Sequence, residues 1–112
     1  MRKAKILFKD QLAGVLVQDD YGSFTFRYDE FWFKNSSKPA ISLSFPKTTQ
    51  EFKSAYLFPF FYHLLPEGSN KQLICSQHRI DETDDFGILL SVAQYDTIGA
   101  VKVIKMEGNS DD

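Results

Sequence analysis

The stretch DDYGSFTFRYDEFWF, residues 19–33, decides the fold class, because it holds the clearest alternation of apolar and polar side chains in the chain. Its first four residues, 19–22, have the composition of a tight turn. After them, Phe24, Phe26 and Tyr28 alternate with polar residues at the period of two that half-buries a β-strand. The sequence therefore predicts a turn followed by a strand with one aromatic face.

The aromatic triplet Phe31-Trp32-Phe33 closes this stretch after a break at Asp29 and Glu30. We expect it to continue the sheet. Neighbouring side chains of a strand point to opposite faces, so either Trp32 or its two Phe neighbours would face away from the core. Aromatic burial on both sides favours a covering helix or a partner protein on the second face.

Further strands are predicted on either side of this stretch. Residues 5–8 and 13–17 are short aliphatic runs separated by a polar connection, a pattern that favours a hairpin. Residues 41–45 are expected to form another short strand, which ends at Pro46. Residues 97–104 are expected to form the closing strand.

The second half of the chain changes to the helical period. A short buried helix is expected over 57–65, where Pro59 is tolerable only near the first turn. Two further helices are predicted, the first capped by Ser69 or Asn70 and the second by Asp84. Their apolar faces consist of Leu73, Ile74, Gln77 and Ile80 in the first and Phe86, Leu89, Leu90 and Ala93 in the second.

Strands, then helices, then one strand define an α+β domain with a mostly antiparallel sheet and about three short helices in its second half. The 112 residues, 43% hydrophobic and 15% aromatic, suffice for one aromatic-rich core but leave no room for a second. We therefore assign residues 1–106 to a single domain and residues 107–112 to a polar tail.

The charges of the chain nearly balance. Its 13 Lys and Arg and 15 Asp and Glu give a net charge of -2 and are interspersed. We therefore expect no basic stripe of the kind that binds phosphates, and direct nucleic-acid binding is disfavoured. The apolar run near the start is too short for a signal peptide or a membrane span. Cys75, the single cysteine, is unable to form an internal disulfide. These features favour a cytoplasmic protein.

No pattern in the sequence points to catalysis. The six glycines are scattered and build neither a P-loop nor a kinase glycine loop. Asp85-Phe86-Gly87 spells a kinase tripeptide, but it lies in the first turn of a predicted helix without a catalytic loop. His63 and His78 lack partners at metal-ligand spacing, and we interpret both as partly exposed helix-edge residues and Cys75 as a small core residue. We predict no catalytic residue, cofactor or metal site.

The segment after the first helix is the strongest surface feature. A proline-containing loop at this place is either a rigid element that inserts into a partner's groove or an ordinary helix-terminating turn. The candidate partner-binding residues are Pro66, Glu67, Gly68, Ser69 and Asn70.

Taken in order, a series of motifs in the chain resembles the amino-terminal subdomain of the HipA toxin kinases. The motifs are GVL at 14–16, FTFRY at 24–28, ISLSFP at 41–46, PFFYHLLPEG at 59–68 and DTIGAV at 96–101. The resemblance runs from about Lys5 to Ile104, and the last two motifs are its most specific parts. One departure is Gln94, since the family often has a glycine two positions before the closing Asp.

The resemblance implies a function that the residues alone do not. A full-length HipA continues into a serine/threonine kinase body, whose ATP-binding and catalytic motifs are absent from this sequence. In the split arrangement of the family, a small HipS protein accompanies a HipT kinase core and a helix-turn-helix HipB. By this resemblance the chain is expected to be a non-enzymatic, HipS-like antitoxin that neutralises a HipT-like kinase, with a HipB-like protein as a further candidate partner. An activating or scaffolding subunit is the open alternative.

Overall fold

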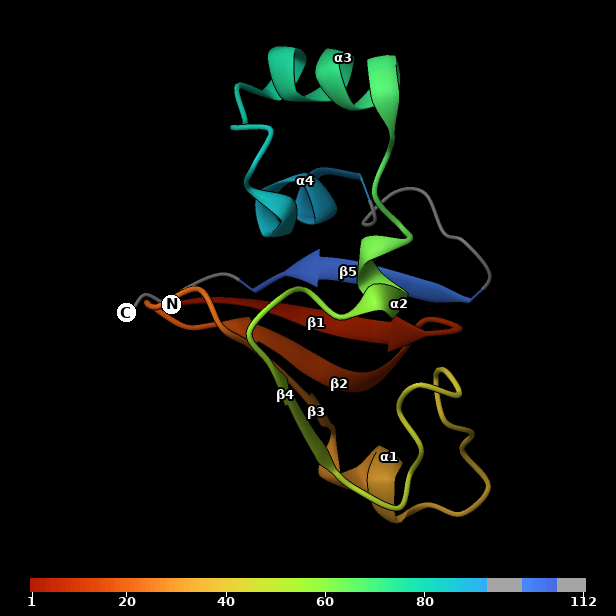
Figure 1. Ribbon diagram of the computed structural model, residues 1–112. Coiled ribbons are helices and arrows are strands. Elements are labelled where there is room, and N and C mark those ends of the chain that lie inside the picture. The colour runs from red at the N-terminus through yellow and green to blue at the C-terminus, as the bar shows by residue number, and fades with distance from the viewer. Residues whose placement is uncertain (93–99, 107–112) are drawn as a thin grey trace.

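The computed structural model describes residues 1–92 and 100–106. It shows a five-stranded sheet in the order β4-β3-β2-β1-β5, in which every neighbouring pair is antiparallel (Figure 1). The strands are β1 (Arg2–Phe8), β2 (Gln11–Gln18), β3 (Phe24–Tyr28), β4 (Glu51–Ser54) and β5 (Val101–Lys105). The helices are α1 (Glu30–Lys34), α2 (Pro59–Tyr62), α3 (Gly68–His78) and α4 (Asp85–Val92). The α+β prediction is confirmed.

Both predicted turns between the first strands are confirmed. Lys9 and Asp10 join β1 to β2 with φ of 50° and 66°, the left-handed backbone that a two-residue hairpin turn requires. Between β2 and β3, the Asp19 carboxylate accepts hydrogen bonds from the backbone N–H of Tyr21 at 2.9 Å and of Ser23 at 3.0 Å. The short polar side chain thus stabilises the turn from within.

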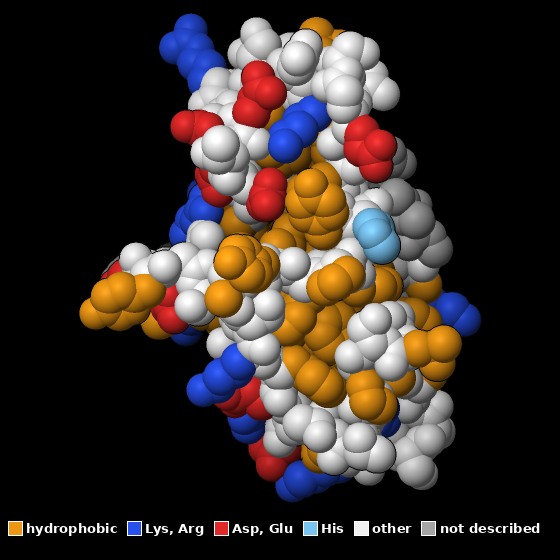
Figure 2. All heavy atoms as spheres, viewed as in Figure 1, with side chains coloured by type: hydrophobic (Ala, Val, Ile, Leu, Met, Phe, Trp, Pro, Cys, Tyr) orange, Lys and Arg blue, Asp and Glu red, His pale blue; other side chains and the backbone are white. Residues whose placement is uncertain are grey.

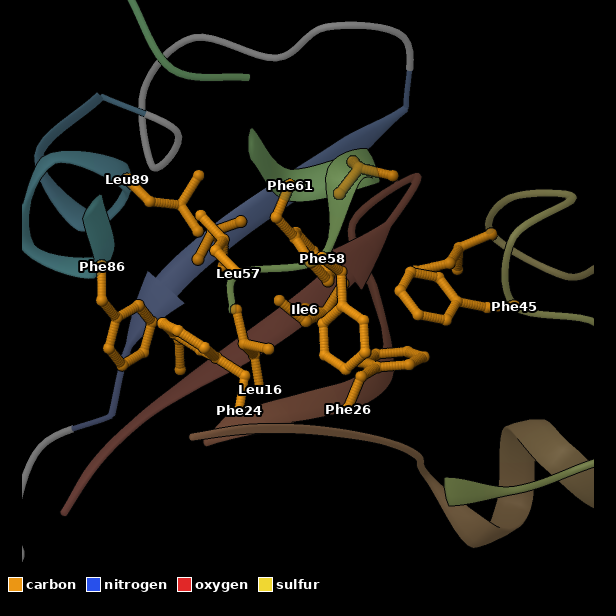
Figure 3. Packing of buried hydrophobic residues seen from close by; sticks show 14 of the residues in the cluster. Ile6, Leu16, Phe24, Phe26, Phe45, Leu57, Phe58, Phe61, Phe86 and Leu89 are labelled. Carbon is orange, nitrogen blue, oxygen red and sulfur yellow. The ribbon is translucent and has the colours of Figure 1, made fainter. Parts of the chain in front are cut away.

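The aromatic face predicted for β3 forms the centre of the core. Phe24, Phe26 and Tyr28 are all buried, and the ring centroid of Phe26 lies 4.7 Å from that of Phe45 and 5.9 Å from that of Phe61 (Figure 3). Phe45 comes from the loop before β4 and Phe61 from α2. The core therefore joins the sheet to segments from both halves of the chain.

The prediction that the aromatic triplet continues the sheet was wrong, because it forms α1. The Asp29 carboxylate accepts a hydrogen bond from the Trp32 N–H at 3.3 Å, and Glu30 forms an ion pair with Lys34 one turn later. Trp32 is buried and donates its indole N–H to the Pro39 carbonyl at 2.9 Å. A cap and a one-turn ion pair thus outweigh the strand preference of the three aromatic residues.

The prediction of a strand over 41–45 was also wrong, because this segment is a turn. The Phe45 N–H bonds to the Ser42 carbonyl at 3.0 Å, and the buried Tyr28 hydroxyl holds both ends of the turn. This hydroxyl donates to the Phe45 carbonyl at 2.5 Å and accepts from the Ile41 N–H at 3.1 Å. The strand at the β3 edge of the sheet is instead β4, whose mostly polar sequence carries little strand signal.

Replacement of Tyr28 by Phe is expected to destabilise the fold by about 1–3 kcal/mol, because it leaves a buried carbonyl and a buried N–H without their shared partner. Burial raises the pKa of Tyr28, so its hydroxyl stays protonated and able to donate. Urea unfolding measures the change. Tyr21→Phe is the control, because Tyr21 is 95% exposed and its change in stability should stay within about 0.5 kcal/mol. Equal stabilities of the two variants would contradict the role of the buried hydroxyl.

The three helices predicted for the second half are present, with Pro59 in the first turn of α2 and Asp84 capping α4 through the Gly87 N–H at 3.1 Å. The cap predicted for the middle helix was wrong. α3 begins at Gly68, so Ser69 and Asn70 lie inside its first turn. Of its predicted apolar face, Leu73 is exposed, because α3 packs on α4 rather than on the sheet (Figure 1). Ala93, Gln94, residues 96–99 and the tail at 107–112 lie outside the described residues.

A cluster of polar contacts joins the start of β1 to the start of α4. The Arg2 guanidinium donates to both oxygens of the Asp84 carboxylate, at 2.6 and 3.0 Å, and to the Gln18 side chain. Its central carbon lies 5.1 Å from the centroid of the Phe86 ring. Arg2 thereby links a strand to a helix more than 80 residues later.

This cluster predicts a pH dependence of stability. The hydrogen bonds from Arg2 lower the pKa of Asp84, helped by the Gly87 N–H, against an opposing effect of burial. A folded-state pKa below the unfolded one contributes stability above the unfolded value, which is lost as the pH falls through the folded value. Arg2→Gln should therefore cost about 1 kcal/mol near neutral pH and progressively less below about pH 4. Urea unfolding of both proteins over this pH range measures the difference, and a constant difference would contradict the assignment.

Candidate partner-binding face

The predicted partner-binding loop lies at the junction of α2 and α3. Pro66 is half-buried, whereas Glu67, Gly68, Ser69 and Asn70 are exposed. Glu67 is the residue before α3 and makes no capping side-chain bond, and Gly68 has a φ of +58°, which favours glycine. The segment is thus a short corner plus the first turn of a helix, and its accessible carboxylate is that of Glu67.

A larger apolar surface borders this corner. The inner side of α2 buries Phe61, while Tyr62 on its outer side is 51% exposed and Tyr56, just before the helix, is 80% exposed. Phe60 is half-buried, and its ring centroid lies 5.1 Å from that of Phe61. Figure 2 shows hydrophobic side chains gathered over the part of the surface that carries α2.

The turn at 41–46 extends this surface. Phe45 anchors it against α2, with its ring centroid 5.2 Å from that of Phe58 and 6.0 Å from that of Phe60. Leu43 lies at the tip and is fully exposed. Because Tyr28 holds both ends of the turn, Leu43 is presented on a fixed backbone, which lowers the entropy lost on binding. We call the surface formed by Leu43, Tyr56, Pro59, Phe60 and Tyr62 the α2 face.

Sequence reasoning missed this α2 face for a physical reason. Leu43 belongs to a segment interpreted as a strand, and Tyr62 lies in the segment 57–65, which was interpreted as a buried helix; Tyr56 lies just before it. The helix is only four residues long, so it buries one side and leaves the other exposed. The density of aromatic residues around the helix was the available signal.

The residues that were weighed as candidates for catalysis or metal binding are either exposed at the surface or packed in the core. His63 and His78 are exposed, as expected. Cys75 is buried, as expected, and burial raises the pKa of its thiol. Phe86 of the kinase-like tripeptide packs in the core, 6.0 Å from Phe24 by ring centroids.

Within residues 1–92 and 100–106, no group of three or more His, Cys, Asp and Glu side chains is placed to hold a metal ion. Over the same residues, no helix has both the length and the apolar character needed to cross a membrane.

The fold is that of a small α+β domain, a five-stranded antiparallel sheet with an exposed apolar surface around α2. Comparison with known proteins gives the family. The family model described as "HipA N-terminal domain" matches residues 4–104, and the chain belongs to this family. It is therefore a HipA-related toxin–antitoxin component, and the matched part is not the catalytic part of a HipA kinase.

Three relatives show where this domain occurs. An uncharacterized protein of Haemophilus influenzae is 34% identical over 103 residues, which are 92% of this chain and 92% of that protein. Y4mE of Sinorhizobium fredii, a candidate kinase by its name, is 27% identical over 104 residues, 93% of this chain but 24% of its own length. A solved structure titled "N-terminal domain of HipA toxin" matches with a TM-score of 0.71 and 33% identity, covering 97% of this chain and 96% of that one.

Proposed function

We propose that the chain is an antitoxin that binds a HipT-like serine/threonine kinase in the cytoplasm and neutralises it. One observation carries the proposal: the same domain makes up nearly all of one relative and 24% of a relative named as a candidate kinase. A domain that is covalently attached in one protein and separate in another is suited to dock on the rest of the longer protein.

The α2 face is the proposed docking surface. Its exposed Tyr side chains are of a type enriched among the residues that anchor interfaces, and the exposed Leu43 adds apolar area beside them. A separate chain lacks the high effective concentration that a covalent link provides, so the interface has to bury at least ~1,000 Å² to hold the complex. The α2 face borders the Pro66–Asn70 corner, so one partner can contact both.

The Pro66–Asn70 corner is proposed to act on the kinase after docking. Glu67 is exposed and makes no capping bond, so its carboxylate is available to a basic group of the partner, such as one that binds phosphate. Inhibition requires only that the chain bind an inactive state of the kinase more tightly than the active one. In this proposal the α2 face supplies the binding energy, whereas the Pro66–Asn70 corner determines which state of the kinase is bound. The two contributions can be tested separately.

Co-expression tests the sign of the effect. Cells that express the HipT-like kinase alone are compared with cells that express it together with this chain, and the two proteins are tested for a stable complex by size-exclusion chromatography. Restored growth with a stable complex supports the antitoxin. Greater toxicity on co-expression supports an activating subunit instead, and the absence of any complex would refute both.

The corner has its own control. Glu67→Gln is matched to Glu82→Gln, which changes another exposed carboxylate in the segment that follows the C-terminal end of α3. We expect Glu67→Gln to reduce growth rescue while Glu82→Gln leaves it intact. Undiminished rescue and binding after replacement of Glu67, Ser69 and Asn70 together would remove the corner from the proposal.

A further inference from the structure

The second face of the sheet has a composition unlike the first. Helices α1, α2 and α4 all pack on the face of the sheet that carries Phe8, Phe24 and Phe26. The ring of Trp32 contacts that of Phe8, Phe61 contacts Phe26, and Phe86 contacts Phe24. The opposite side chains of the strands are exposed or half-buried, and no described residue packs across them. The sheet is therefore covered on one side and open on the other over the described residues.

Strand register gathers basic side chains on this open face. Lys5 of β1 pairs with Val15 of β2, which pairs in turn with Arg27 of β3. Lys3 pairs in the same way with Val17, and that row of cross-strand partners continues through β3 to Lys53 of β4. Cross-strand partners share a face, so these cations are neighbours although they are far apart along the chain. The basic members of the open face are Lys3, Lys5, Arg27, Lys53 and Lys102.

The carboxylates near this face neutralise only part of that charge. Glu51 forms ion pairs with Arg27 at 3.2 Å and Lys53 at 3.5 Å, and Asp10 pairs with Lys102 at 2.8 Å. Lys3 and Lys5 on the central strand β1 are exposed and form no ion pair with any residue of 1–92 or 100–106. The whole chain has a net charge of -2, so this positive surface is a local concentration of charge.

The centre of the open face is apolar. The half-buried side chains between the cations are Leu7, Val15, Val17 and Ile104. At one corner, Thr25 and Lys53 line a shallow open depression together with Asp19, Ser23 and Phe24. An aliphatic stripe bordered by lysines complements a surface with the opposite charge and the same apolar centre.

We propose that the open sheet face binds an acidic protein surface, one that carries aliphatic side chains flanked by Asp and Glu. Charge complementarity supplies steering and specificity, and the aliphatic stripe supplies the buried area. The face lies opposite the α2 face across the sheet, so a protein bound here does not compete with one bound there. The chain is then an adaptor with two separate docking faces.

A nucleic acid is the weaker fit to the same face. Single strands are bound by sheets that offer aromatic side chains on which bases stack, and this face presents aliphatic residues instead. Its positive charge is also interrupted by Glu51 and Asp10, which repel a phosphate backbone. The observations favour a protein, and nucleic acid serves as an outcome of the test.

The probe is an amphipathic helical peptide with Leu along one side and Glu flanking it, titrated into the isotope-labelled full chain and followed by NMR. We expect saturable shifts confined to the residues of the open face on the five strands, and weaker binding as salt increases. The Lys3→Glu, Lys5→Glu variant should weaken binding at least about tenfold. Val15→Thr with Val17→Thr, which keeps β-branched residues in the strand, should weaken it about threefold or more.

The matched control is Lys34→Glu with Lys71→Glu, which gives the chain the same net charge but changes residues of α1 and α3. This control should bind the peptide as the unchanged protein does. Equal loss in both charge variants, shifts outside the open face, or no saturable binding would overturn the proposal. Tighter binding of a DNA oligonucleotide than of the peptide at equal salt would also overturn it.

Binding of an acidic protein at the open face is a separate property from kinase neutralisation, so one can fail while the other holds. The Lys3→Glu, Lys5→Glu variant should retain kinase binding and growth rescue, because neither residue belongs to the α2 face. Loss of kinase binding in this variant would contradict the separation of the two faces.

Discussion

Simultaneous replacement of Leu43, Tyr56 and Tyr62 by Ala is expected to weaken binding to the HipT-like kinase by about 4 kcal/mol, roughly a thousandfold. Each side chain is a large exposed group on the α2 face, and burial of such anchors supplies most of the energy of an interface. Isothermal titration calorimetry with the purified kinase measures the loss. Growth rescue by the same variant should fail in parallel.

The control for this experiment is Tyr21→Ala. Tyr21 is 95% exposed, like the anchors, but lies in the turn between β2 and β3 and does not belong to the α2 face. Its removal should leave the affinity unchanged within about twofold, as expected of a residue outside the interface. Equal affinities for the triple variant and the Tyr21 variant would show that the kinase, if bound, uses another surface.

The second large effect is expected at Gly14, in β2 against the aromatic face of β3. A Cβ at this position would lie 2.6 Å from the Arg27 carbonyl oxygen and 2.8 Å from a ring carbon of Phe26. Neither neighbour is able to yield, because one is backbone and the other is a buried ring in the core. Gly14→Ala should therefore destabilise the protein by about 3 kcal/mol and lower the Tm by about 15 °C.

Gly22→Ala separates this steric effect from the general cost of replacing glycine. Gly22 has a φ of +91°, but a Cβ there would meet nothing within 4 Å. Its replacement strains only the backbone and should cost about 1 kcal/mol. Thermal unfolding of the two variants compares them directly. A smaller loss for Gly14→Ala than for Gly22→Ala would contradict the close packing of β2 on β3.

Prediction from sequence succeeded where the signal is local. The alternation at Phe24, Phe26 and Tyr28 predicted a strand because a sheet with one buried face needs that period. Asp19 and Asp84 were correctly interpreted as turn and cap residues, because their carboxylates bond to nearby backbone N–H groups. The order of motifs along the chain also predicted the family to which the chain belongs.

Prediction failed where a distant partner determines the structure. The segment 41–45 has the alternation of a strand, but the hydroxyl of Tyr28 bonds to both of its ends and holds it as a turn. The strand β4 was missed because Phe52 is its only large apolar residue. Its pairing with β3 supplies the stability that its own composition does not.

The candidate partner-binding residues illustrate the same division. The Pro66–Asn70 segment was found from proline and glycine, which mark chain reversals locally. The α2 face was not found, because exposure of Leu43 and Tyr62 depends on how loop and helix pack on the sheet. Residue type alone does not distinguish an exposed interface residue from a core residue of the same type.

The sequence by itself determined the α+β class, the aromatic core strand, the turns and the family, since each depends on local periodicity, capping or motif order. The tertiary structure alone decided which side chains meet. Pairing of strands far apart along the chain gathers Lys3, Lys5, Arg27 and Lys53 on one face of a chain whose charges nearly balance. Register is a property of two strands together, so neither strand's sequence specifies it alone.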